Sequence, residues 1–164
     1  MLPMTRSGLA RIAVVVVTAC MISTLSPAPS AAQEHMTGFR PAVAEYAPDD
    51  RQLAKFYRHS EFGAGWTGEG AEFLQRRKAL IEALGRASSH GLPQSRYDTS
   101  GLMDQMRRAK TPRDLGVLDV ALSKAYLNYA HDVQSGIVVP SSIDKGIVRK
   151  VNYHDRAELM SDLI

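Results

Sequence analysis

Apolar side chains recur at a helical period along most of the chain after residue 48. The strongest series follows the tetrapeptide Thr111-Pro112-Arg113-Asp114, a capping box with proline at the first helical position. Gly136 marks the end of the helix that this series predicts. The apolar positions are Leu115, Leu118, Leu122, Ala125, Tyr126, Tyr129 and Val133. Their spacing predicts one long amphipathic helix.

Four shorter helices are predicted by the same pattern and by their end signals. They cover about residues 49–59, 71–90, 100–110 and 155–164. Asp49 or Asp50 can cap the first of them. The second stops at His90-Gly91-Leu92-Pro93, because glycine suits a left-handed position and proline cannot continue a helix. Its apolar stripe is Phe73, Leu80, Leu84 and Ala87, with Leu74 and Ile81 beside it.

The segments between these helices carry weaker signals. Residues 33–48 are mixed in composition, and we expect them to be mobile, as chain termini usually are. A glycine-rich turn contains Trp66, which we expect to pack onto the helices as a plug. Residues 137–140 are predicted to be extended, and Pro140 confines them to an edge or irregular stretch. The predicted fold class is all-α, a small helical bundle of about five helices.

Residues 1–32 have the pattern of a cleaved signal peptide, which predicts export to the periplasm. Arg6 and Arg11 precede an apolar run over residues 12–25, which is shorter than the roughly 20 residues that span a bilayer. Small residues before the bond between Ala32 and Gln33 predict cleavage there. Two alternatives stay open: an uncleaved anchor, or a lipoprotein in which Cys20 is lipidated. Membrane association is expected only through these routes.

Removal of the signal peptide changes the charge and the chemistry of the chain. The formal net charge of the 164 residues is +3, and the loss of two arginines lowers it to +1. Basic and acidic residues are interspersed, so no nucleic-acid partner is expected. The chain's one cysteine is lost with the signal peptide, which excludes a cysteine nucleophile in the remainder. The basic run Arg76-Arg77-Lys78 is expected to lie on a solvated helix face.

Candidate chemistry is sparse in the remaining sequence. No two of the histidines at 35, 59, 90, 131 and 154 have the spacing that places a pair of metal ligands on one helix face. Asp119 lies near the start of the long helix, an ordinary place for an acid, and Asp132 lies on the same helix. We therefore assign no catalytic residue, no cofactor and no metal ligand.

Three groups of residues, taken in order, resemble a known family. Phe56-Tyr57 is followed by Trp66-Thr67. Ala83-Leu84, Ala87 and His90-Gly91-Leu92 precede Tyr97. A third stretch runs from Leu118-Asp119 through Tyr129, Asp132 and Gly136 to Pro140. Together they resemble the helical scaffold domain of large bacterial murein L,D-transpeptidases, and the resemblance covers about residues 48–164. The motif residues that we single out, each expected to be structural, are Trp66, His90, Gly91, Leu92, Tyr97, Asp119, Tyr129, Asp132, Gly136 and Pro140.

The resemblance implies a scaffold domain at 49–164 in a periplasmic protein of peptidoglycan cross-linking and cell-wall remodelling. Such transpeptidases carry their nucleophile in an S-H-G-C-x-R motif of a downstream β-rich domain. Ser89-His90-Gly91 is followed here by Leu92, so no catalytic residue can be carried over. The last predicted helix lacks a stop signal, which favours truncation of a longer protein, and the alternative is a terminal helix that docks back on the bundle.

Two other functions stay open. The chain can be a freestanding, non-catalytic module that binds peptidoglycan stem peptides or cell-wall enzymes. It can also be an unrelated periplasmic adaptor with an exposed docking face of Leu159, Met160, Leu163 and Ile164.

Overall fold

The computed structural model describes residues 31–138 and 154–163. Its α-helices are α1 (Ala31–Tyr46), α2 (Arg51–His59), α3 (Ala71–Gly85), α4 (Thr99–Arg108), α5 (Pro112–Ser135) and α7 (Arg156–Ser161). Two short 3₁₀ turns, η1 (Ala87–His90) and η2 (Gln94–Arg96), connect α3 to α4. The described residues contain no strand, so the all-α prediction is confirmed.

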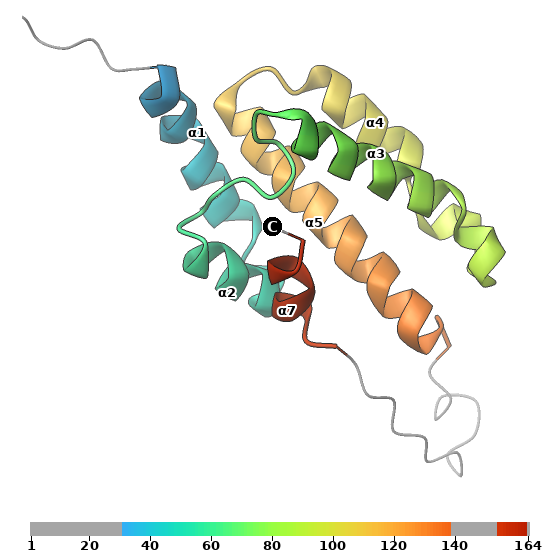
Figure 1. The fold of residues 1–164 in the computed structure, drawn as a ribbon. Helices are drawn as coiled ribbons and strands as arrows, with labels where there is room; N and C mark the ends of the chain where they lie inside the picture. The colour runs from blue at the N-terminus through green and yellow to red at the C-terminus, as the bar shows by residue number, and fades with distance from the viewer. Residues whose placement is uncertain (1–30, 139–153, 164) are drawn as a thin grey trace, which may run out of the picture.

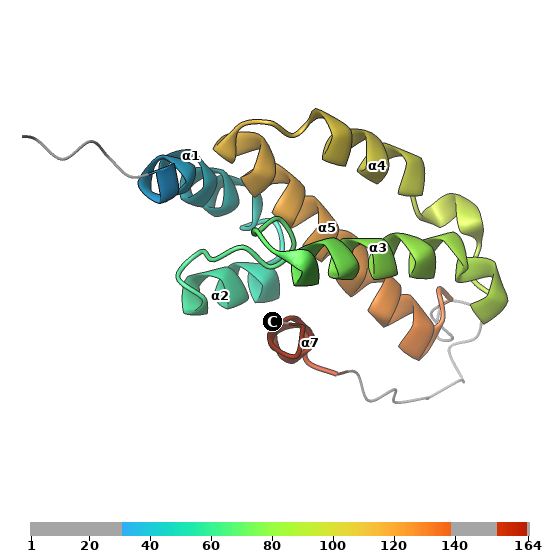
Figure 2. The same cartoon turned by 45° about the horizontal axis from the view of Figure 1, so that its top comes forward.

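Helix α5 runs through the middle of the domain and separates two hydrophobic cores. Helices α1, α2 and α7 lie along one flank of α5, and α3 and α4 lie along the other (Figures 1 and 2). Val120 and Leu127 of α5 belong to the first core, whereas Leu118 and Leu122 belong to the second. The long helix is therefore apolar on two faces and serves both cores.

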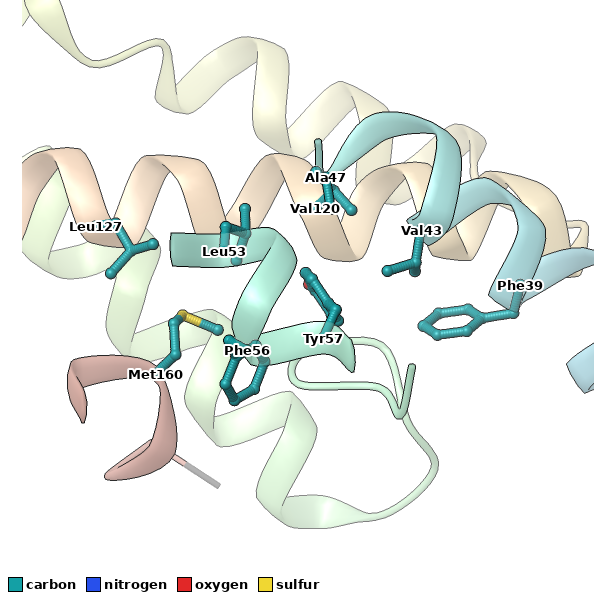
Figure 3. Packing of buried hydrophobic residues seen from close by; sticks show 9 residues of the cluster. All are labelled: Phe39, Val43, Ala47, Leu53, Phe56, Tyr57, Val120, Leu127 and Met160. Atoms are coloured by element: carbon teal, nitrogen blue, oxygen red, sulfur yellow. The ribbon is translucent and has the colours of Figure 1, made fainter. Parts of the chain in front are cut away.

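The first core joins the two ends of the described chain. Phe39 and Val43 from α1 pack with residues of α2 and α5, and Met160 from α7 points toward Phe56 and Leu127 (Figure 3). Its buried members are Phe39, Val43, Ala47, Leu53, Phe56, Tyr57, Val120, Leu127 and Met160. The second core gathers around the loop tryptophan and comprises Trp66, Leu80, Leu84, Ala87, Leu92, Tyr97, Leu118 and Leu122.

The predicted helix signals act largely as expected. Asp50 caps α2 by accepting hydrogen bonds from the backbone of Gln52 and Leu53, at 3.0 and 3.1 Å. The capping box of α5 is present, with Thr111 and Asp114 each accepting from the other's backbone N–H. Gly136 ends α5 with a φ of 75°, a conformation that favours glycine. The helix expected over 71–90 is shorter, because the backbone tightens to η1 after Gly85.

The expectation of a mobile segment at residues 33–48 is wrong. This segment forms α1, which buries Phe39, Ala42 and Val43 against the rest of the domain. Gly116 of α5 permits the close approach, because a Cβ atom there would lie 2.6 Å from the carbonyl oxygen of Phe39. The predicted cleavage point between Ala32 and Gln33 falls in the first turn of α1, and cleavage stays a prediction.

The last helix is also placed differently from the expectation of an exposed apolar face. Met160 is fully buried, and Leu159 and Leu163 are partly buried against the cores. The predicted face is therefore not wholly exposed, because Met160 is buried where α7 packs on the bundle, and its role in docking stays a prediction. Ile164 and Pro140 lie outside the described residues. No helix in the described part is long and apolar enough to cross a membrane.

The contact between α1 and α5 can be tested with two glycine substitutions. We expect Gly116→Ala to lower the free energy of unfolding by about 1–3 kcal/mol, because the new methyl group overpacks the interface. Gly85→Ala is the matched control, since the new methyl group would meet nothing within 4 Å beyond its chain neighbours and its own helix backbone, and alanine favours helix by up to about 1 kcal/mol. Urea unfolding measures both. Equal stabilisation by the two substitutions would show that α1 does not pack on α5.

Candidate functional site

Asp119 on α5 is the most highly connected of the motif residues. Its side chain is fully buried and faces the loop between α2 and α3. Oδ1 accepts hydrogen bonds from the Tyr57 hydroxyl at 2.7 Å and from the Gly65 N–H at 3.1 Å. Oδ2 accepts from the Trp66 N–H at 2.9 Å, and from the Thr67 N–H and hydroxyl, each at 2.8 Å. One carboxylate thus binds α2 and three consecutive loop residues to α5.

Ser123 extends this cluster by one helical turn. The Trp66 indole N–H donates to Ser123 Oγ at 2.9 Å, and Ser123 Oγ lies 2.8 Å from the Tyr57 hydroxyl oxygen. Because the tyrosine proton goes to Asp119, the serine hydroxyl donates to Tyr57. Burial, and then the charge of Asp119, raise the pKa of Tyr57 well above its ordinary value. The phenol therefore stays a neutral donor to the carboxylate. We call this cluster of Tyr57, Gly65, Trp66, Thr67, Asp119 and Ser123 the Asp119 node.

Two arginines of α3 hold the same loop from the other side. Arg76 Nη1 donates to the Gly65 carbonyl oxygen, and Arg77 Nη1 donates to that of Trp66. The expectation that Arg76-Arg77-Lys78 is a wholly solvated run is therefore wrong for the arginines. Lys78 does lie on the surface, 3.8 Å from Glu82. The loop residues are consequently bound through their N–H groups to α5 and through their carbonyl groups to α3.

Asp132 forms a second node near the end of α5. Its side chain is buried and accepts a hydrogen bond from the Tyr97 hydroxyl at 2.8 Å. It also accepts from Arg96 Nε at 2.5 Å and from Arg96 Nη2 at 3.3 Å. His131 Nδ1 lies 3.4 Å from Oδ1. We call Arg96, Tyr97, His131 and Asp132 the Asp132 node.

The pKa values of Asp132 and Tyr97 in this node are shifted in opposite directions. Burial of Asp132 favours its neutral form, but hydrogen bonds from Arg96 and Tyr97 outweigh this and hold the pKa of Asp132 below its ordinary value. Burial, followed by the hydrogen bond to Asp132, raises the pKa of Tyr97 to about 12. An ionised carboxylate thus faces a protonated phenol and a guanidinium at neutral pH.

The other motif residues lie around these nodes. The Tyr129 ring meets Tyr97 and His90 edge-on, with centroids 5.5 and 6.2 Å apart. His90 is exposed, and Gly91 takes the left-handed conformation, with a φ of 72°. Leu92 returns the chain into the second core. These residues shape the turn between α3 and α4.

Both acids are surrounded by hydrogen-bond donors of the domain itself. A carboxylate offers about four lone-pair sites, and the donors around Asp119 occupy all of them. Asp132 is likewise surrounded by donors and closed to solvent. In the described part of the chain, no three His, Cys, Asp or Glu side chains come together as a metal site.

The sequence pattern places Asp119 as an ordinary acid near a helix start, whereas the structure buries its side chain completely. Sequence reasoning also missed Ser123 and the two arginines. The available signal was that Asp119 and Ser123 follow the buried Leu118 and Leu122, so polar residues lie next to the apolar series at helical spacing. Such a position requires buried hydrogen-bond partners.

The fold and the two nodes define a helical domain whose buried acids bind loop residues to the long helix α5. A family model described as a scaffold domain matches residues 51–164, and the chain belongs to this scaffold domain family. Comparison with curated proteins and with solved structures found no match.

The strength of the Asp119 node can be measured by Asp119→Asn. We expect this change to lower the free energy of unfolding by about 3 kcal/mol, because an amide NH₂ would face buried N–H donors and leave some without an acceptor. Asp104→Asn is the control, since Asp104 is partly exposed and forms ion pairs with two exposed arginines, Arg107 and Arg108. Denaturant unfolding followed by Trp66 fluorescence gives both values. A loss at Asp119 no larger than at Asp104 would contradict the role of the node.

Proposed function

We propose that this chain supplies the scaffold part of a murein L,D-transpeptidase, which acts in peptidoglycan cross-linking and cell-wall remodelling. The observation that carries the proposal is the match to a scaffold domain over residues 51–164. The resemblance adds the ordered motifs from Phe56-Tyr57 to Gly136. Several of these motif residues belong to the two nodes, which bind loops to α5. This arrangement suits a domain whose role depends on its shape.

The proposed role is positional. In the transpeptidases that the motifs resemble, a cysteine attacks a tetrapeptide stem and passes the acyl group to another stem. These 164 residues contain no S-H-G-C-x-R motif, so the proposal assigns that chemistry to a domain outside the printed sequence. The scaffold would hold that domain in a fixed orientation, because its loops are bound at both ends of α5.

The proposal also includes export to the periplasm through residues 1–32. We expect the intact mass of the protein recovered from cells to correspond to a chain that begins at Gln33. The measurement is mass spectrometry of the periplasmic fraction. A mass that begins at a lipidated Cys20 would replace this route with lipoprotein processing, and an unprocessed mass in the cytoplasm would contradict export.

The transpeptidase assignment itself is tested by the DNA beyond codon 164. We expect it to encode, in this or a shifted frame, a segment with the S-H-G-C-x-R motif. An intact stop codon followed by an unrelated gene would contradict the assignment. In that case, retention of the purified chain on isolated sacculi, compared with a control protein of similar charge, would distinguish a peptidoglycan-binding module from a protein unrelated to the wall.

A further inference from the structure

No further inference is drawn: the strongest candidate, the cavity between η2, α4 and α5 that Arg96 and Asp98 line, carries nothing because Arg96 already binds Asp132, Asp98 already caps α4, and nothing in the structure shows what would occupy the cavity.

Discussion

The arrangement of the domain depends on one buried carboxylate. Burial of an ionised group costs several kcal/mol unless hydrogen bonds replace its hydration, and Asp119 receives five. Its donors belong to α2 and to the loop before α3, so the charge is stabilised only when both segments are in place. Loop closure, the position of α2 and the orientation of Trp66 are therefore coupled to one side chain of α5.

The second node gives the opposite end of α5 the same role, and together the two nodes determine where α3 lies. At its start, α3 holds the loop through Arg76 and Arg77. Past its end, Gln94 Nε2 donates to the Leu84 carbonyl oxygen at 2.8 Å, and η2 leads directly to the Asp132 node. Helix α3 is therefore fixed at both ends by polar contacts and on one face by Leu80 and Leu84.

Features with local causes could be predicted from the sequence, whereas those with distant partners could not. The capping box at Thr111 and the glycine at 136 act within a few residues, and both ends of α5 were predicted. Helix α1 contains Gly38 and Pro41, and its stability comes from packing against Gly116 far along the chain. Burial of Asp119 likewise depends on a loop 52 to 54 residues earlier. The apolar pattern of one helix does not reveal these distant partners, which are Gly116 for α1 and the loop residues 65–67 for Asp119.

Buried carboxylates are an indirect way to stabilise a helical bundle, since apolar side chains of similar volume often serve as well. The buried carboxylates also determine the exact position of the loop along α5. Apolar contacts tolerate small sliding and repacking, whereas donors at 2.7–3.1 Å from two fixed oxygens define the loop relative to α5. We infer that the sequence uses its buried acids to fix shape, which is the property that a scaffold needs.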